Sequence, residues 1–299
     1  MKILISGAIA FGLEQKNRIK SLGISVDYFE QESETIKNPE EYEIIVCNNL
    51  FNNNSIKLFT NLRCIQLTSA GFDKIDLAYC KQKNICVLNA KGVYSIPIAE
   101  WIVLKILEIY KKTFFFIQNQ KDKHWQKDRN LFELNGKTAT IVGFGSIGQE
   151  TAKRLRAFGV FINTVDTYKV RTEYNDQSYL TTDIETPLSQ SDIVILTLPL
   201  TNITYHLFSD RLFEVMKEDA VLINVSRGNV IDEASLIKSV GKFRGIALDV
   251  FEEEPLSENS QLWDLPNVIV TPHNSFVSEK NNERLFNLIY ENIRDYKGK

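Results

Sequence analysis

Hydrophobic residues along this chain fall into two series of short apolar runs, and stretches with helical spacing lie between the runs. Runs rich in β-branched residues that end in Gly, Asn, Ser or Asp are typical of parallel strands connected by helices. The first series predicts strands at Lys2–Ser6, Ser25–Phe29, Glu43–Cys47, Cys64–Thr68 and Ile85–Asn89. The second series predicts strands at Thr138–Val142, Phe161–Val165, Asp192–Pro199, Val221–Ser226, Gly245–Val250 and Val268–His273. The six runs of the second series are apolar throughout, which indicates a sheet with both faces covered.

Two longer stretches with helical spacing decide how the predicted sheets are divided between domains. Ile96–Lys112 connects the two series, and Lys105 is the one interruption of its apolar face. Ser278–Lys299 has apolar residues on one helical face and follows the last predicted strand, so we expect it to pack back on the first sheet. The prediction is an α/β protein with two doubly wound parallel-sheet domains. Residues 1–94 and 275–299 form one domain, and residues 95–274 form the other.

Composition excludes several classes of protein without identifying a function. The 299 residues are 43% hydrophobic and 24% charged, which is the range of globular proteins. The formal net charge is −3, so no basic surplus points to a nucleic acid or an anionic membrane. No apolar run approaches the roughly 18 residues of a membrane helix. We therefore expect neither a nucleic-acid nor a membrane partner.

Cysteine and histidine usage argues against disulfides and metal sites. The four cysteines form no Cys-x-x-Cys pair, and the three histidines lack the spacing of metal ligands. Reduced thiols in a cytoplasmic protein are the favoured interpretation. Met1–Ala10 could also be read as a short signal peptide, but Gly7 breaks its apolar run. A buried first strand that turns at Gly7 explains the same residues.

A glycine-rich turn after the first strand of the second series is the strongest local motif. Gly143, Gly145 and Gly148 have the spacing Gly-x-Gly-x-x-Gly between an apolar strand and a helical pattern. Such glycines allow a tight turn, a close approach of backbone to pyrophosphate, and packing of the helix on the strand. The next strand runs into Asp166, where a carboxylate would accept hydrogen bonds from the adenosine ribose. The turn predicts a dinucleotide site, and Asp166 favours NAD as the cofactor.

Charged side chains follow three later strands of the second series. Arg227, the acidic run that ends at Glu254, and His273 come after successive strands, and ligands of open α/β sheets bind beyond the carboxyl ends of the strands. Hydride transfer to a 2-oxo acid needs an Arg to hold the carboxylate, a His to donate a proton, and a carboxylate to orient the His.

Each of these residues also has a purely structural interpretation. Arg227 could cap a strand end, Glu254 could be part of a solvated acidic surface, and His273 could be an ordinary loop histidine. Their occurrence together beside a dinucleotide site favours the catalytic interpretation.

Short motifs are distributed along nearly the whole chain. They are Thr68–Asp73, Asn89–Val93, Ala99–Glu100, Gly143–Gly148, Asn224–Gly228, Leu248–Phe251, Glu254–Pro255 and Thr271–His273. Together they resemble the D-isomer-specific 2-hydroxyacid dehydrogenase family, which includes D-lactate, phosphoglycerate, glycerate and hydroxyisocaproate dehydrogenases. The resemblance implies a Rossmann cofactor domain inserted in a flavodoxin-like substrate domain. It also implies a homodimer that pairs through the cofactor domain, and the apolar stretch Phe114–Trp125 is a candidate contact.

The resemblance also assigns roles to individual residues. It implies that Arg227 binds the substrate, that Glu254 pairs with the catalytic His273, and that the backbone of Ala70 and Gly71 meets the substrate carboxylate. The implied cofactor contacts, besides the three glycines and Asp166, are Ser146, Ile147, Leu198, Pro199, Val225, Ser226 and Asp249. Of these, Asp249 would lie near the nicotinamide carboxamide.

Two departures from the family pattern concern the site. The span from Arg227 to Glu254 is about two residues shorter than usual, which makes Glu252 or Glu253 a rival for the role of Glu254. Asn274, Ser275 and Phe276 replace the small and apolar residues that commonly follow the catalytic His.

The residues and the family resemblance leave three functions open. The favoured one is an NAD-dependent enzyme that interconverts a 2-oxo acid and a D-2-hydroxy acid. An NADPH-linked glyoxylate or hydroxypyruvate reductase is the second, and a dinucleotide-sensing protein similar to the corepressors of the family is the third. The substrate side chain would meet the loops Ala8–Leu13, Asn48–Asn53 and Ser69–Asp73, where no charged residue indicates a phosphate or a second carboxylate. The several asparagines there are better read as turn formers than as ligands.

Overall fold

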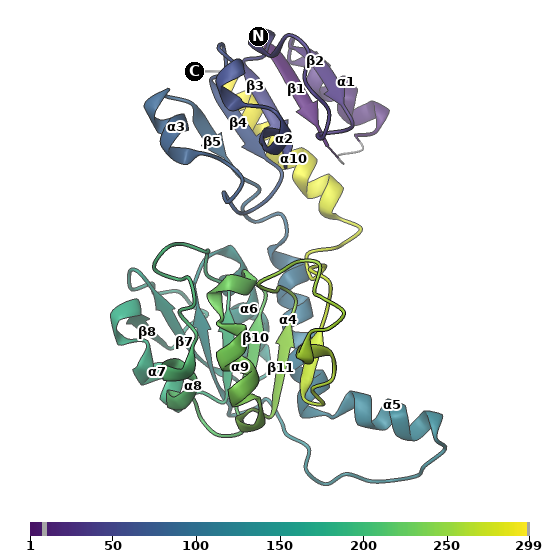
Figure 1. Cartoon of the computed structure of the whole chain (residues 1–299), viewed down its shortest axis with the longest axis vertical. Helices are drawn as coiled ribbons and strands as arrows, with labels where there is room; N and C mark the ends of the chain where they lie inside the picture. The colour runs from purple at the N-terminus through teal and green to yellow at the C-terminus, as the bar shows by residue number, and fades with distance from the viewer. Residues whose placement is uncertain (8–10, 298–299) are drawn as a thin grey trace. The chain divides into compact units, whose positions relative to one another are not determined.

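The chain divides into two compact units in the computed structural model, which describes residues 1–7 and 11–297. Unit 1 comprises Met1–Tyr94 and Ser278–Lys299, and unit 2 comprises Ser95–Val277 (Figure 1). The sequence predicts that the chain passes from one domain to the other after residues 94 and 274. In the structure it passes from one unit to the other after Tyr94 and after Val277.

Unit 1 contains a parallel sheet whose strands are ordered β2-β1-β3-β4-β5 in the described residues. These strands are β1 (Lys2–Ser6), β2 (Ser25–Phe29), β3 (Ile44–Cys47), β4 (Cys64–Leu67) and β5 (Cys86–Leu88). All neighbouring strands are parallel. This order is that of the flavodoxin-like fold, and it brings the carboxyl ends of β1, β3 and β4 side by side. The predicted strands of the first series are therefore confirmed, with small differences at their ends.

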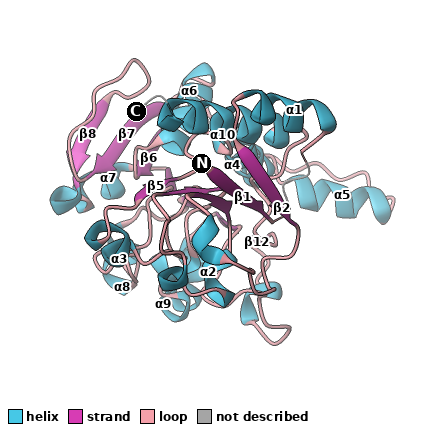
Figure 2. Cartoon of the chain, turned by 90° about the horizontal axis from the view of Figure 1, so that it is seen from above, coloured by secondary structure: helices cyan, strands magenta, loops and turns pink. Residues whose placement is uncertain are grey.

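Helices cover both faces of the unit 1 sheet (Figure 2). On one face lie α1 (Leu13–Ser21) and α10 (Asn281–Lys297), and on the other lie α2 (Leu50–Asn53) and α3 (Leu77–Gln82). The last helix, α10, buries Phe286 and Ile289 against the sheet, and the Phe286 ring meets the Phe11 ring edge-on at 5.2 Å. The expectation that the final helix packs back on the first sheet is confirmed.

Unit 2 contains a larger parallel sheet ordered β12-β11-β10-β9-β6-β7-β8. Its strands are β6 (Thr138–Val142), β7 (Phe161–Asp166), β8 (Gln177–Leu180), β9 (Ile193–Leu196), β10 (Val221–Asn224), β11 (Gly245–Leu248) and β12 (Val268–Val270). The order is that of a Rossmann sheet with one further strand, so the predicted fold class is confirmed. The predicted number of six strands is wrong. The missed strand, β8, is a partly exposed edge strand, and its polar residues lack the apolar pattern of buried strands.

Helices also cover both faces of the unit 2 sheet (Figure 1). One face carries α4 (Ser95–Tyr110) and α6 (Ser146–Ala157), and the other carries α7 (Glu185–Gln190), α8 (Asp210–Val215) and α9 (Glu233–Ser239). Lys105, the polar interruption in α4, is buried and pairs with Glu108 at 2.8 Å. A further helix, α5 (Thr113–Lys121), stands out from the sheet, and the chain after it runs back toward β6. None of the helices in the described part of the chain is long and apolar enough to span a membrane.

Candidate active site

The three glycines of the turn after β6 face different surroundings. Gly143 has a φ of +90°, and a Cβ there would lie 2.7 Å from the backbone of Leu198. A Cβ on Gly148 would lie 2.6 Å from the carbonyl oxygen of Gly143, which packs the start of α6 on the turn. A Cβ on Gly145 would meet no atom within 4 Å. The first and third glycines are thus required by packing, whereas the second leaves open space of the kind a pyrophosphate needs.

Asp166 at the end of β7 is bound to the glycine turn. Its Oδ2 accepts a hydrogen bond from the backbone N–H of Phe144 at 2.7 Å, and its Oδ1 accepts one from Thr167 N–H at 2.7 Å. These bonds hold the carboxylate beside the turn, where a ribose would lie. Lys169 and Arg171, which follow on the loop, are both exposed.

The other predicted cofactor contacts lie around the same turn. Ser146 and Ile147 form the first residues of α6, where unpaired backbone N–H groups favour anions. Leu198 is buried against Gly143, and Pro199 beside it is exposed. Thr197 Oγ1 donates a hydrogen bond of 2.5 Å to the carbonyl oxygen of Gly143, which ties the end of β9 to the turn.

Asn224 at the end of β10 shapes the turn that carries Arg227. Its Oδ1 accepts hydrogen bonds from both the backbone and the side chain of Ser226, and its Nδ2 donates to the carbonyl oxygen of Arg227. Val225 and Ser226 are buried. The Arg227 guanidinium donates to the carbonyl oxygen of Ser226 at 2.7 Å, which bends the side chain back over the turn.

Gly228 brings two of the predicted catalytic residues to neighbouring turns. A Cβ on Gly228 would lie 1.8 Å from the carbonyl carbon of Phe251, so the turn after β10 lies directly against the turn after β11. Arg227 precedes this contact and Glu254 follows it three residues beyond Phe251. Only glycine can occupy this position without displacing backbone.

His273 and Glu254 form a hydrogen-bonded pair. His273 Nδ1 lies 2.8 Å from Glu254 Oε2, and the other oxygen of Glu254 accepts from the backbone N–H of Phe251 at 3.1 Å. The His273 side chain is 41% exposed and that of Glu254 is 36% exposed, so a substrate can reach the pair. His273 has a φ of +48°, in the left-handed region that non-glycine residues seldom adopt and that is often found at functional sites.

The rival carboxylates of the acidic run are placed differently. Glu252 accepts a hydrogen bond from the backbone N–H of Glu233, whose side chain accepts one from the backbone N–H of Glu252 in return. His206 Nε2 lies 3.0 Å from Glu252 Oε1. Burial raises the pKa of Glu233 above its usual value. Glu253 is exposed, and Glu254 is the member of the run whose carboxylate lies 2.8 Å from His273 Nδ1.

Asp249 is fully buried and holds the segment that contains His273. Its Oδ1 accepts hydrogen bonds from Thr271 Oγ1 at 2.6 Å and from Asn274 N–H at 3.0 Å, and its Oδ2 accepts from Ser275 N–H at 2.9 Å. The predicted contact of Asp249 with the nicotinamide stays a prediction, and the structure adds an anchoring role for this carboxylate.

The predicted substrate loop of unit 1 follows β4. The carbonyl oxygen of Ala70 accepts from Asn89 Nδ2, and that of Gly71 accepts from Ser69 Oγ at 3.0 Å. These bonds fix the peptide planes of the loop. Of the predicted loop Ala8–Leu13, residues 8–10 lie outside the described residues.

Three supporting residues were missed in the sequence-based site. Asn224, Thr197 and Thr271 each hold a predicted site residue or its loop, and each directly follows or ends an apolar strand. A polar residue at the carboxyl end of a buried strand is the signal that could have identified them. No cluster of three potential metal ligands is present in the described ranges.

Comparisons with known proteins identify the class to which this fold and site belong. Residues 103–275 match the family model of the D-isomer specific 2-hydroxyacid dehydrogenase, NAD binding domain. The chain is 37% identical over 243 residues to a glyoxylate reductase from Thermofilum pendens, covering 78% of this chain and 71% of the relative. It is 31% identical over 278 residues to a D-3-phosphoglycerate dehydrogenase from Archaeoglobus fulgidus, covering 91% of this chain and 53% of the relative.

A solved structure agrees over almost the full length of both chains. It is D-lactate dehydrogenase from Aquifex aeolicus complexed with NAD and lactic acid, with a TM-score of 0.78, 26% identity, and coverage of 99% of this chain and 95% of the other. The chain therefore belongs to the D-isomer specific 2-hydroxyacid dehydrogenase family. It is an oxidoreductase that interconverts 2-oxo and 2-hydroxy acids with a nicotinamide dinucleotide, as the motifs predicted.

Proposed function

We propose that this enzyme reduces a 2-oxo acid to the D-2-hydroxy acid with NADH, and that Arg227, Glu254 and His273 catalyse the reaction. The hydrogen-bonded pair of His273 and Glu254 at the strand ends of unit 2 is the observation that carries the proposal. Unit 2 is the cofactor domain in this proposal, because it contains the glycine turn. Unit 1 is the substrate domain, and its backbone at Ala70 and Gly71 receives the substrate carboxylate.

The residues around the glycine turn fit a dinucleotide. The open space at Gly145 accepts the pyrophosphate, the first N–H groups of α6 donate to it, and Asp166 accepts from the ribose hydroxyls. Bound there, the nicotinamide cofactor would supply the hydride that reduces the carbonyl carbon.

The proposed proton donor is His273. Because Glu254 accepts from Nδ1, the opposite nitrogen, Nε2, is the one that presents a proton to the ketone oxygen of the substrate. Glu254 fixes the ring orientation and compensates the positive charge of the protonated ring. In the direction of oxidation, Nε2 takes the proton from the hydroxyl group.

The proposed role of Arg227 is to bind and polarise the substrate. A guanidinium offers several N–H donors in one plane, which suits a carboxylate and the adjacent ketone oxygen. Negative charge develops on that oxygen during reduction, so a fixed cation stabilises the transition state more than the ground state.

Oxidation of NADH in the presence of a panel of 2-oxo acids tests the proposal directly. We expect turnover with at least one short 2-oxo acid and a product of the D configuration. Binding of NADH without turnover of any member would contradict the proposal and favour the dinucleotide-sensing alternative.

We also propose that NAD is the preferred cofactor. Asp166, held against Phe144, would repel a 2′-phosphate, whereas Lys169 and Arg171 are exposed and therefore screened by solvent. We expect kcat/KM with NADH to exceed that with NADPH by at least about tenfold. Asp166→Ser should narrow or invert this ratio, and Asp264→Ser, at an exposed position of the same unit, should leave it unchanged. An unchanged ratio in Asp166→Ser would show that this carboxylate does not discriminate the cofactors.

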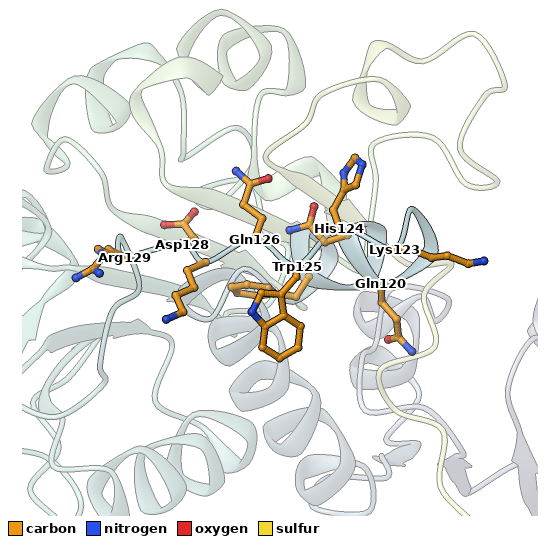
Figure 3. A pocket seen from close by; sticks show the side chains of 10 residues that line it. Gln120, Lys123, His124, Trp125, Gln126, Asp128 and Arg129 are labelled. Carbon is orange, nitrogen blue, oxygen red and sulfur yellow. The ribbon is translucent and has the colours of Figure 1, made fainter.

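A homodimer that pairs through the cofactor unit is the proposed assembly. The segment after α5 lines a hollow of about 810 Å³, and Trp125 in this segment is 97% exposed (Figure 3). Phe114 and Ile117 on α5 are also largely exposed. Exposed apolar side chains grouped on one segment are typical of an interface, and pairing of identical segments about a two-fold axis would bury them.

The proposed location of the enzyme is the cytoplasm. Cys47, Cys64 and Cys80 are buried free thiols and Cys86 is an exposed one, which suits a reducing compartment. Fractionation of the source cells would test this proposal.

A further inference from the structure

Glu32, in the loop after β2, occupies the carboxyl edge of the unit 1 sheet. Its Oε1 accepts hydrogen bonds of 2.8 Å from Ser6 Oγ at the end of β1 and of 2.8 Å from the backbone N–H of Asn48 after β3. Its Oε2 accepts one of 2.6 Å from the backbone N–H of Asn49. Three donors from two neighbouring strand ends thus converge on one carboxylate.

The backbone around Glu32 is shaped to admit this carboxylate. Gly7, which follows β1, has a φ of +84°, and a Cβ there would lie 2.9 Å from Glu32 Oε1. The side-chain oxygens of Asn48 and Asn49 are buried and have no donor among the described residues. The edge of the sheet at β1 and β3 therefore carries the carboxylate charge of Glu32, and the two buried amide oxygens add no positive charge to it.

The position of this charge relates directly to the proposed substrate loop. The sheet order places β3 between β1 and β4, and Ala70 and Gly71 follow β4. Adjacent strands are roughly 5 Å apart, so the ends of β3 and β1 lie about 5–10 Å from the end of β4. A 2-oxo acid with its carboxylate at the loop could extend its side chain toward Glu32.

We propose that Glu32 is a specificity-determining residue that excludes 2-oxo acids with a second negative charge. The accepted substrates would be short 2-oxo acids with an uncharged side chain, such as hydrogen, methyl or hydroxymethyl. This inference rests on the proposed function, because it takes the loop at Ala70 and Gly71 as the site of the substrate carboxylate. Glu32 was not recognised in the sequence, because it lies outside the loops predicted to meet the substrate.

Electrostatics supports the exclusion. Two like charges about 5–10 Å apart near a protein surface repel each other by an amount that changes affinity several-fold or more. The backbone N–H groups of Asn48 and Asn49 that could otherwise bind a phosphate or carboxylate already donate to Glu32. A second anion would therefore meet the repulsion and find these donors occupied.

The test compares kcat/KM for two matched pairs of substrates with NADH as the reductant. Pyruvate and oxaloacetate differ by one carboxylate, and hydroxypyruvate and 3-phosphohydroxypyruvate differ by one phosphate. We expect the wild-type enzyme to prefer the member without the second charge by at least about tenfold in each pair. Glu32→Gln, which keeps the size and one acceptor oxygen, should lower that preference by about fivefold or more. Glu30→Gln removes the same charge from an exposed neighbouring position and should leave the preference unchanged.

The outcomes separate this inference from the proposed function. If the wild type reduces none of the four acids, the proposed function fails and the inference fails with it. Equal use of charged and uncharged members by the wild type would overturn the inference alone, whether or not the variant folds. The inference would also be overturned by a preference that Glu32→Gln leaves intact, or that Glu30→Gln lowers as much.

Discussion

At the scale of single residues, the candidate site depends on contacts that link distant parts of the sequence. Asn224 shapes the turn of Arg227 through bonds within three residues, which a local pattern can suggest. Glu32, by contrast, meets Ser6 and Asn48 across 26 and 16 residues of chain. Glu32 and Asn48 lie in loops and Ser6 ends β1, so such a cluster becomes visible only when the strand order is known.

His273 provides the most direct test of the proposed mechanism. We predict that His273→Gln lowers kcat by about a hundred- to ten-thousandfold while NADH still binds, because the proposed proton donor is lost and the glycine turn is untouched. Glu254→Gln should lower kcat by at least about tenfold, since the ring loses its charged partner. Steady-state kinetics and NADH fluorescence titration measure both effects.

The neighbouring carboxylate at Glu253 serves as the matched control. Glu253→Gln should leave kcat within about twofold of the wild type, because this side chain is exposed and the carboxylate that pairs with His273 is that of Glu254. Loss of activity in Glu253→Gln with retention in Glu254→Gln would show that the assignment of the carboxylate is wrong.

Gly228 offers a test of the contact between the turn of Arg227 and the turn of Glu254. We predict that Gly228→Ala lowers the free energy of unfolding by about 2–3 kcal/mol, because its Cβ would overlap the backbone of Phe251. Gly241→Ala is the control, since a Cβ there meets no atom within 4 Å, and it should be neutral or stabilise by up to about 1 kcal/mol. Urea denaturation measures both variants. Equal stability of the two would disprove the close approach.

At the scale of secondary structure, buried strands were predictable and polar or irregular elements were not. The strands β6, β9 and β10 are apolar because both of their faces are buried, and their positions follow from the sequence. The edge strand β8 has one neighbour and exposed residues, so its formation depends on pairing with β7 rather than on its own pattern. The end of one helix also differs from the prediction. The predicted helical stretch continues to Lys112, whereas α4 ends at Tyr110.

The start of α9 is capped by a carboxylate. Asp232 caps the helix, and its Oδ1 accepts a hydrogen bond from the backbone N–H of Ser235 at 3.0 Å. This bond holds the pKa of Asp232 below its usual value. A carboxyl whose pKa is lower in the folded state stabilises the protein above its unfolded pKa, and the contribution is lost as the pH falls through the folded value.

We therefore predict a pH-dependent effect of removing this cap. Asp232→Ala should cost about 1 kcal/mol at pH 7, and the cost should diminish as the pH is lowered below about 4. Asp232→Asn keeps an acceptor for Ser235 and should retain most of the stability at pH 7. Urea denaturation as a function of pH measures the difference, and a cost for Asp232→Ala that persists unchanged in acid would contradict it.

At the scale of the whole molecule, two sheets with different strand orders are assembled from one chain that leaves unit 1 once and returns to it. The apolar face of α10 could predict this return, because the second sheet is already complete before that helix begins. The arm, which consists of α5 and residues 122–129, could be predicted only as an apolar stretch, because the spacing of its residues does not indicate what they would pack against.

The proposed dimer is tested at this scale. We predict that light scattering at micromolar concentration gives twice the chain mass of 34.3 kDa. Trp125→Ala should weaken the dimer by at least about tenfold, because it removes the most exposed aromatic side chain of the arm. Trp263→Ala is the control, since this tryptophan is also exposed in unit 2 but lies outside the arm. A monomeric wild type would refute the proposed assembly.

The buried carboxylate of Asp249 has a consequence for the entropy of catalysis. Three hydrogen bonds to Asp249 immobilise the segment of Thr271, Asn274 and Ser275, within which His273 lies. The conformational entropy of ordering that segment is therefore lost when the protein folds, and little of it remains to be lost when substrate binds. If His273 is the proton donor as proposed, this anchoring gives it the same geometry in every turnover, independent of how tightly any one substrate is held.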